Sequence, residues 1–326
     1  MRLERFDFPG STQWALVCGQ RPSSPVLLLV QAGPGIPMIH EARAHEHALG
    51  LEDHFRVVYW DQRGTGKSFD RSARGVVTVA DLVADVGAMI RGLSERLGVA
   101  KIDVVGFSLG ASLALLAAAA DPAHLRSLVC VGPDVNFIES ERFAYSFAIE
   151  EARRHGHKRA MRALRSIGEP PHDDTKRFMT RIRWVANFRG IHRGKGFAAL
   201  VRTNLGRLWA SPRYSFREKV GALRGMSVTQ ERVLPSLRSF DLLSQELRIQ
   251  VPMAFFQGRH DVAAPPALTA ALAKRLGARL TWFDNSAHMP HEEEPRRFRE
   301  ELLRFIRPEE HAPPSLPTTR SPHDPQ

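Results

Sequence analysis

Cysteine is scarce in this chain. Only Cys18 and Cys130 occur among its 326 residues, and they lie far apart in the sequence. Two thiols outside any motif argue neither for a disulfide framework nor for a zinc site. The sequence therefore favours a protein of the reducing cytoplasm, and we expect no cofactor.

Long apolar runs are absent as well. The longest, 26–30 and 113–120, are much shorter than the roughly 20 residues that a membrane-spanning helix needs. The first ten residues lack the apolar core of a secretory signal. We therefore expect no membrane association and no secretion.

Acidic residues are outnumbered: 35 Asp and Glu face 46 Lys and Arg, a net charge of +11. The surplus is concentrated between Asp134 and Asp241, where 22 basic residues face 11 acidic ones. A basic patch can indicate nucleic-acid binding, but no nucleic-acid motif accompanies this one. We interpret it as a solvated set of Arg-rich helices and expect no nucleic-acid partner. The sequence leaves the oligomeric state open.

The segment 101–110, Lys-Ile-Asp-Val-Val-Gly-Phe-Ser-Leu-Gly, precedes an Ala- and Leu-rich run at 111–120. A β-branched run followed by high helix propensity predicts a strand, a sharp turn and a helix. Gly106 and Gly110 allow the backbone to pass close to itself while Ser108 takes strained torsion angles. Ser108 is therefore the candidate nucleophile, placed at the positive end of a helix.

Two later loops supply a carboxylate and an imidazole. An apolar run ending at Gly258 is followed by Asp261, and a second run ending at Phe283 is followed by His288. Loops at the carboxyl ends of parallel strands share one crevice. We therefore expect Ser108, Asp261 and His288 to form a catalytic triad.

The acid and the histidine of the triad have rivals nearby. Asp134 ends the strand that follows the Ser108 helix. His260 adjoins Asp261, and His291 lies three residues beyond His288. We prefer His288 because His291 falls closer to the final helix. The pattern Gly-x-x-Asp-x-x-x-Pro at 258–265 resembles the acid loop of the α/β-hydrolase superfamily. This resemblance favours Asp261, although some members of that superfamily take their acid from the position of Asp134.

Three motifs together resemble the α/β-hydrolase superfamily, and within it the prolyl-aminopeptidase-like (proline iminopeptidase) branch. They are Gln-Ala-Gly-Pro-Gly at 31–35, Trp-Asp-Gln-Arg-Gly-Thr-Gly-Lys-Ser at 60–68 and Gly-Phe-Ser-Leu-Gly at 106–110. The resemblance covers essentially the whole core and implies a serine hydrolase that works through an acyl-enzyme. The branch has His-Gly-Gly-Pro-Gly at the first motif, so Gln31 and Ala32 depart from its pattern.

The resemblance also implies an oxyanion hole. Two backbone N–H groups would bind the developing negative charge. One belongs to Leu109, directly after the nucleophile, and the family pattern assigns the other to Gly33. The side-chain amide of Gln31 can organise this loop in place of the family's histidine.

Alternating strands and helices predict an α/β fold with a mostly parallel twisted sheet covered on both faces. The alternation stops at Asp134 and resumes at Val251. We assign 1–134 and 242–307 to the α/β-hydrolase core, and 135–241 to an inserted helical cap (lid). The tail, 308–326, has few apolar residues to bury and is expected to be disordered. Six cap aromatics are expected to be exposed: Phe143, Tyr145, Phe178, Trp184, Phe188 and Trp209.

The resemblance implies that a short peptide or small molecule binds under the cap and loses its N-terminal residue, typically proline. Family members hold the substrate ammonium with acidic cap residues near a Trp-x-x-Trp-Glu segment, where this chain has Arg-Trp-Val-Ala-Asn at 183–187. A basic cap is a poor environment for a cation. A carboxylesterase, a lactonase or a non-catalytic binding homologue therefore remains an alternative. The candidate amine-binding acids are Glu139, Glu141, Glu150 and Glu151.

Two further patterns lead to no ligand. Gly-Thr-Gly-Lys-Ser at 64–68 ends like a phosphate-binding loop but lacks its first glycine. His40 and His45 are five residues apart, whereas a zinc-protease helix places its histidines four apart. We expect a solvated loop there and no metal.

Overall fold

The computed structural model describes residues 1–19, 21–172 and 174–307. Its centre is one eight-stranded sheet of order β1-β2-β4-β3-β5-β6-β7-β8. The first two strands and the β2–β4 pair are antiparallel, and the rest of the sheet is parallel. The strands are β1 (Arg2–Phe8), β2 (Ser11–Cys18), β3 (Val26–Val30), β4 (Arg56–Asp61), β5 (Ile102–Phe107), β6 (Leu125–Val131), β7 (Met253–Gly258) and β8 (Arg279–Phe283).

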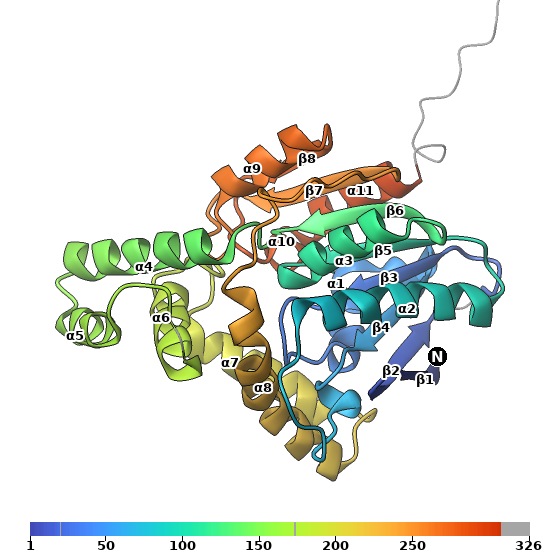
Figure 1. Ribbon diagram of the computed structural model, residues 1–326, viewed down its shortest axis with the longest axis horizontal. Helices are drawn as coiled ribbons and strands as arrows, with labels where there is room; N and C mark the ends of the chain where they lie inside the picture. Colours follow the sequence, from blue (N-terminus) through green and yellow to red (C-terminus); the bar gives the residue numbers. More distant parts are fainter. Residues whose placement is uncertain (20, 173, 308–326) are drawn as a thin grey trace, which may run out of the picture.

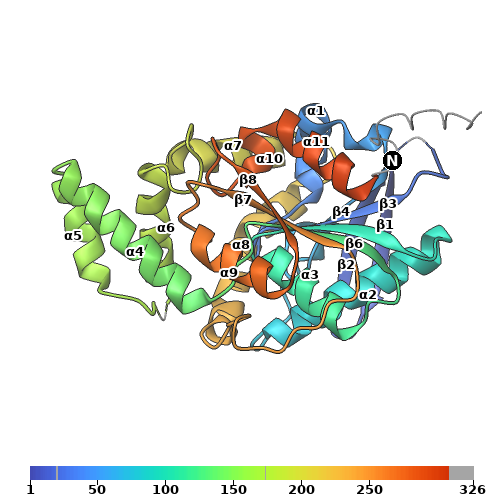
Figure 2. The same ribbon diagram turned by 90° about the horizontal axis from the view of Figure 1, so that it is seen from above.

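Helices cover both faces of the sheet, as Figures 1 and 2 show. One hydrophobic core joins the sheet to α2 (Val79–Leu97), α3 (Leu109–Ala120) and α9 (Pro266–Arg275). A second core joins the opposite face to α1 (Ala42–Leu49) and α11 (Pro295–Ile306). Every residue of β3 is buried, as a strand covered on both sides requires. The short elements are η1 (Ile39–Glu41), η2 (Leu51–Asp53), η3 (Gly66–Ser68) and α10 (Pro290–Glu293).

Among the described residues between β6 and β7, the structure forms five helices. They are α4 (Phe137–Arg154), α5 (Lys158–Ile167), α6 (Thr175–Asn187), α7 (Phe197–Ala210) and α8 (Phe216–Leu237). The first three share a small core of their own, and α4 and α5 project away from the sheet in Figure 1. The C-terminal part of α8 instead packs into the first core of the sheet.

The expected α/β-hydrolase fold is confirmed: the sheet is mostly parallel, it is covered on both faces, and helices are inserted after β6. The division into domains at 134/135 and 241/242 stays a prediction, and the expected disorder of 308–326 lies outside the described residues. The expected exposure of the cap aromatics holds for Phe143 and Trp209, at 45% and 44%. Tyr145, Phe178 and Phe188 are half-buried, and for Trp184 the expectation is wrong. Trp184 is only 6% exposed, because its ring packs edge-on against His157 and stacks on Phe188.

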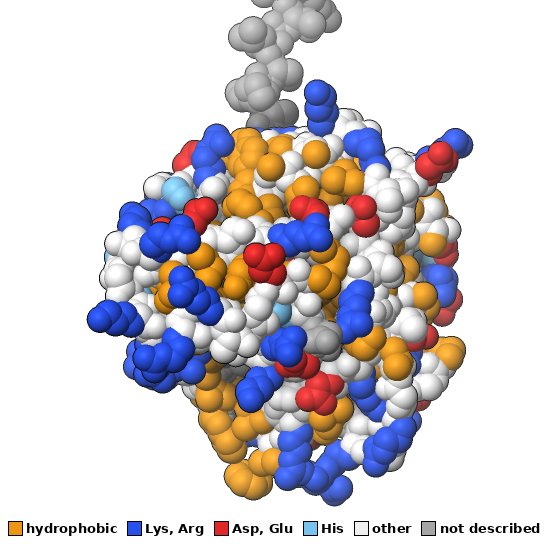
Figure 3. All heavy atoms as spheres, turned by 60° about the vertical axis from the view of Figure 1, so that its left-hand side comes forward, with side chains coloured by type: hydrophobic (Ala, Val, Ile, Leu, Met, Phe, Trp, Pro, Cys, Tyr) orange, Lys and Arg blue, Asp and Glu red, His pale blue; other side chains and the backbone are white. Residues whose placement is uncertain are grey.

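Figure 3 brings the α4–α5 side forward and shows Lys and Arg side chains scattered over it rather than gathered in one block. This distribution agrees with a solvated basic surface. Within the described part of the chain, no helix combines the length and the apolar character that crossing a membrane would require.

Candidate active site

Ser108 lies at the turn between β5 and α3 with φ 50° and ψ −127°. This left-handed φ is strained for a residue with a side chain. Glycine is required on both sides of it. A Cβ on Gly106 would lie 2.4 Å from the Cα of Ala111, and one on Gly110 would lie 2.1 Å from the carbonyl oxygen of Gln31. The local sequence thus fixes the Ser108 side chain at the carboxyl end of β5.

Asp261 and His288 meet at the carboxyl ends of β7 and β8. His288 Nδ1 lies 2.8 Å from Asp261 Oδ2. Asp261 is 2% exposed, and its carboxylate also accepts the backbone N–H of Ala264 at 2.8 Å and the Gln257 amide at 3.1 Å. These contacts fix the carboxylate, which in turn orients the imidazole and leaves Nε2 for a reaction partner.

Burial by itself lowers the pKa of His288. The charge of Asp261, the hydrogen bond to it and the charges of Asp134 and Glu293 together outweigh burial and raise the pKa above its ordinary value. Ser108 and His288 line the same cavity. An imidazole with raised basicity therefore faces the same space as the strained serine.

The rival residues occupy other positions. Asp134 is bonded to Ser140 Oγ at 3.1 Å, and burial raises its pKa to about 6. His291 is the second residue of α10, its ring centroid lies 4.6 Å from that of Phe107, and burial lowers its pKa to about 3. His260 is exposed and lines a separate groove on the outer surface. Of the two candidate acids, Asp261 is the one hydrogen-bonded to His288.

The candidate oxyanion donors border the same cavity. Gly33, in the loop after β3, and Leu109, the first residue of α3, line it together with Ser108. Gln31 organises this loop as expected: its amide donates to the carbonyl of Gly33 at 2.9 Å. The Gln31 side-chain oxygen lies 3.4 Å from Thr65 Oγ1. A glutamine therefore provides contacts within the loop where the family pattern has histidine.

The cavity has a volume of about 490 Å³ and lies between the ends of the parallel strands and helices α4, α6, α7 and α8. Most of its wall is apolar, with Phe107, Phe137, Phe178, Met226 and Leu234 among the lining side chains. Its charged lining residues are four carboxylates and two guanidinium groups: Glu41, Asp134, Glu141, Glu292, Arg181 and Arg207. The cavity wall is therefore acidic although the outer surface of these helices is basic.

Glu41 and Glu292 form the most polar end of the cavity, together with Arg207. Arg207 Nη1 lies 2.6 Å from Glu41 Oε2 and 2.7 Å from Glu292 Oε1. Burial raises the pKa of Glu292, yet hydrogen bonds from Lys195 and Arg207 lower it to about 2. Burial also raises the pKa of Glu41. Its hydrogen bond with His40 and the positive charges around it lower the pKa by more, so the net shift is downward. Both groups are therefore anionic at neutral pH.

The expected solvated loop at His40 and His45 is wrong. Both side chains are buried, at 4% and 7% exposure, and His45 lines the cavity. The described residues contain no group of three or more His, Cys, Asp or Glu side chains arranged to hold a metal ion. The segment thus contributes to the cavity wall, which its resemblance to a zinc helix did not indicate.

The acids expected to bind a substrate amine are mostly elsewhere. Glu139 and Glu151 line the outer groove, and Glu150 is exposed on α4. Only Glu141 lines the cavity, where it is paired with buried Arg181. Sequence reasoning missed Glu41 and Glu292, although Glu292 lies only four residues beyond His288.

The motif at 60–68 attaches the inserted helices to the sheet. Asp61, at the end of β4, is fully buried and accepts the Tyr214 hydroxyl at 2.6 Å. Lys67 Nζ lies 2.6 Å from Glu218 Oε1, and the carbonyl of Gly64 accepts the Thr229 hydroxyl at 2.7 Å. The segment that resembles a phosphate loop therefore anchors the helices that close the cavity.

Comparison with known proteins agrees with this architecture. The family model described as alpha/beta hydrolase fold matches residues 25–295. A probable aminopeptidase, YbaC of Bacillus subtilis, is 28% identical over 313 residues, which cover 94% of this chain and 96% of that protein. The proline iminopeptidase of Xylella fastidiosa is 35% identical over 115 residues, 35% of this chain and 34% of that protein.

Among solved structures, VinJ superposes with a TM-score of 0.63 at 21% identity, over 94% of this chain and 98% of that one. This likeness shows the fold. The named relatives agree with the prolyl-aminopeptidase-like branch that the motifs indicated. The chain therefore belongs to the α/β-hydrolase fold family, and it is a hydrolase.

Proposed function

We propose that the protein is a serine hydrolase in which Ser108 is the nucleophile, His288 the general base and Asp261 the acid that orients His288. The observation that carries the proposal is the 2.8 Å contact between His288 Nδ1 and Asp261 Oδ2, at the rim of the cavity that the strained Ser108 also lines. A serine hydroxyl is a weak nucleophile at pH 7 and needs an adjacent base.

In the proposed reaction, Ser108 Oγ attacks the acyl carbon of the substrate while its proton passes to His288 Nε2. The N–H groups of Leu109 and Gly33 stabilise the oxyanion. His288 then donates the proton to the leaving amine or alcohol, and the acyl group stays on Ser108. Water, deprotonated by His288, releases the acyl group as a carboxylic acid and restores the serine.

The preferred substrate is a short peptide or small amide that loses its N-terminal residue. The charge of the cavity wall supports this choice. Its four carboxylates outnumber its two guanidinium groups, and a net negative wall favours a cationic substrate. Glu41 and Glu292 are the anionic groups we assign to the substrate ammonium. The full-length similarity to a probable aminopeptidase supports the same substrate class.

A small carboxylic ester is the second candidate. Both glutamates at the polar end already bond to Arg207, and the remaining wall is largely apolar. A neutral substrate would fit this lining without disturbing those pairs. Esterase or lactonase activity would follow from the same triad.

The test combines labelling with a substrate panel. An active-site phosphonate should label the wild-type protein and leave Ser108→Ala unlabelled, and the substitution should lower kcat by about 10⁴-fold or more. Proline arylamides are then compared with short acyl esters. Turnover of esters alone would exclude the aminopeptidase, and failure of wild-type protein to label would exclude the serine mechanism.

We place this enzyme in the cytoplasm. The support is chemical: Cys18 and Cys130 are both free and buried, as expected of a protein that folds without disulfides.

A further inference from the structure

A second cavity lies on the outer surface, on the other side of Asp261 from the active site. It is a groove of about 720 Å³ between α4, the loop after α6 and the loop after β7. His260 and Asp261 line the groove, whereas Ser108 and His288 line the catalytic cavity. The loop that carries the triad acid therefore forms a wall of this groove.

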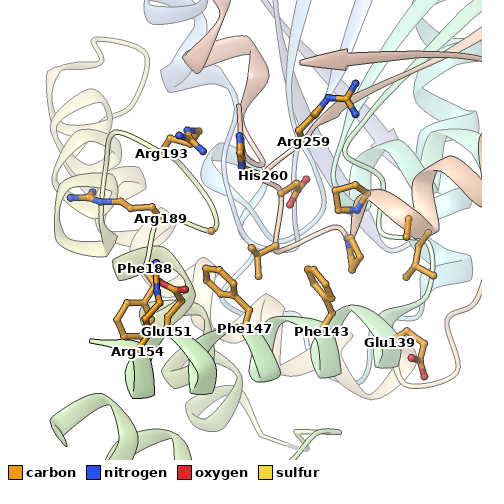
Figure 4. Close-up of a pocket in the computed structure, with 17 residues that line it drawn as sticks. Glu139, Phe143, Phe147, Glu151, Arg154, Phe188, Arg189, Arg193, Arg259 and His260 are labelled. Atoms are coloured by element: carbon orange, nitrogen blue, oxygen red, sulfur yellow. The ribbon is translucent and has the colours of Figure 1, made fainter. Parts of the chain in front are cut away.

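The floor of the groove is apolar. Figure 4 shows Phe143 and Phe147 projecting from α4 into the space beneath the β7–α9 loop. Phe143 is 45% exposed, and the facing wall contains Val262, Pro265 and Leu268. Exposed aromatic surface in a concave site is typical of a place where an apolar group binds.

The rim of the groove is cationic. Its two glutamates are already paired with arginines on the same helix: Glu139 with Arg142 at 2.7 Å and Glu151 with Arg154 at 2.6 Å. Arg259 also lines the rim and is paired with Asp284 at 2.5 Å.

Two rim arginines differ from these. Within residues 1–19, 21–172 and 174–307, no carboxylate lies within ion-pair distance of the side chain of Arg189 or Arg193. Both side chains are exposed and both belong to the loop after α6, which forms one end of the groove. In Figure 4 Arg193 lies near His260, whereas the Arg189 side chain extends away from Phe143 and Phe147. Exposed side chains change rotamer rapidly, so both arginines can turn toward a ligand at this end of the groove.

The segment between these arginines is bonded to the catalytic loops. The carbonyl of Gly190 accepts the N–H of Val262 at 3.0 Å, and the carbonyl of Ile191 accepts the N–H of His288 at 3.0 Å. The Arg193 N–H donates to Glu293 Oε1 at 2.6 Å. A ligand held by Arg189 and Arg193 would therefore sit on the segment that supports both His288 and the residue after Asp261.

We propose that this groove is a second binding site, for an amphipathic carboxylate whose apolar chain lies on Phe143 and Phe147 and whose head group is held by Arg189 and Arg193. Guanidinium groups bind planar carboxylates in paired hydrogen bonds. The choice of a carboxylate over other anions rests on the second candidate of the proposed function, because hydrolysis of a carboxylic ester releases a carboxylate without an ammonium group. The match between an amphipathic anion and a groove with an apolar floor and a cationic end does not depend on the proposed function.

The probe is octanoate, with its binding measured by calorimetry on the full chain. Because the catalytic cavity is also apolar, binding is measured before and after phosphonate labelling and again in Ser108→Ala. We expect one equivalent to bind in all three cases. Labelling is read separately by mass, so failure of the proposed triad is distinguishable from failure of the groove.

Two double variants locate the site. Arg189→Asn with Arg193→Gln should weaken octanoate binding by about ten-fold or more, because the charge-assisted bonds are lost; asparagine is chosen because it tolerates the left-handed φ of 68° at position 189. Arg183→Gln with Arg202→Gln removes the same charge from exposed positions outside the groove and should leave the affinity unchanged. If both double variants weaken octanoate binding equally, the proposed site is wrong and the binding reflects nonspecific electrostatic attraction.

The apolar part is tested by Phe143→Ala, which should weaken octanoate but not acetate. Octanol should bind more weakly than octanoate. Preference for octyl phosphate over octanoate would overturn the carboxylate assignment. A different result would show that a second copy of the chain covers the groove. In that case wild-type protein binds no octanoate, and Phe143→Ala sediments as a smaller species than the wild type.

Discussion

His288 lies near two buried carboxylates, Asp261 and Asp134, which differ in what they contact. Asp261 bonds directly to the imidazole, whereas Asp134 bonds to Ser140 and acts on His288 only through its charge. In the proposed mechanism His288 must be neutral to accept the proton of Ser108. The pKa of His288 therefore sets the acid limb of the pH profile of kcat/KM.

At the residue scale we predict that Asp261→Asn lowers kcat by about 10⁴-fold and moves this acid limb to lower pH. Burial lowers the pKa of His288, and Asp261 is the main group that raises it. Without the carboxylate the pKa falls, so the residual activity persists to lower pH than in the wild type. The measurement is kcat/KM against pH for both proteins.

Asp134→Asn is the matched control. It should shift the acid limb in the same direction by a smaller amount and retain most of kcat, since Asp134 only adds charge near the imidazole. A greater loss of kcat in Asp134→Asn than in Asp261→Asn would instead assign the triad acid to the end of β6.

The residues that could be predicted from the sequence are those at fixed spacings from a turn. Ser108 is set by its two glycines, and Asp261 and His288 by the strand ends they follow. Glu41 and Glu292 have no such signature, because their role depends on how η1 and α10 pack against Arg207 of α7. His40 and His45 are buried because of how their segment packs in the folded protein. The surrounding sequence is polar, so it does not predict this burial.

At the scale of elements, the β5–α3 turn depends on contact with the loop after β3. The carbonyl oxygens of Val30 and Gln31 lie 2.7 and 2.1 Å from where a Cβ on Gly110 would be. Both contacts are backbone atoms, which cannot move aside as the end of a side chain can. They belong to the strand end that leads into the candidate oxyanion loop at Gly33.

We predict that Gly110→Ala lowers the free energy of unfolding by about 2–3 kcal/mol through overpacking and abolishes measurable turnover by displacing Gly33. The control is Gly206→Ala in α7, where an added Cβ meets nothing within 4 Å. That change should raise the free energy of unfolding by about 0.5–1 kcal/mol through helix propensity. Urea denaturation measures both, and equal stability of the two variants would contradict the packing argument.

For the whole molecule, the sequence predicts the order of the helices and strands better than it predicts how the inserted helices pack against the sheet. Alternating strands and helices and the change in pattern after β6 indicate the sheet and the insertion. They do not show that α8 packs into the core of the sheet, or that Asp61 contacts four separate backbone and side-chain donors. The contact between Asp61 and Tyr214 joins residues that are 153 positions apart in the chain, and no local pattern records it.

Asp61 connects the inserted helical segment to the sheet. Its carboxylate accepts the backbone N–H groups of Met38, Ile39 and Lys67 at 2.8, 3.0 and 2.9 Å, in addition to the Tyr214 hydroxyl. Burial raises its pKa, and these donors oppose that rise. The inserted helices and the sheet therefore share one buried carboxylate, and we expect them to unfold together.

Tyr214→Phe removes one of those donors and leaves the other three. We predict that it lowers the free energy of unfolding by about 2 kcal/mol, because hydrogen bonds to buried charged groups are stronger than neutral ones. Tyr145→Phe is the control: its hydroxyl donates to the carbonyl of Leu164 at 3.3 Å at a half-buried position, and its loss should cost below about 1 kcal/mol. Urea unfolding is followed by tryptophan fluorescence and by circular dichroism, whose midpoints should coincide in both variants. Separate transitions in the wild type would show that the inserted helices unfold on their own, and an equal cost for the two tyrosines would show that Asp61 does not hold the two parts together.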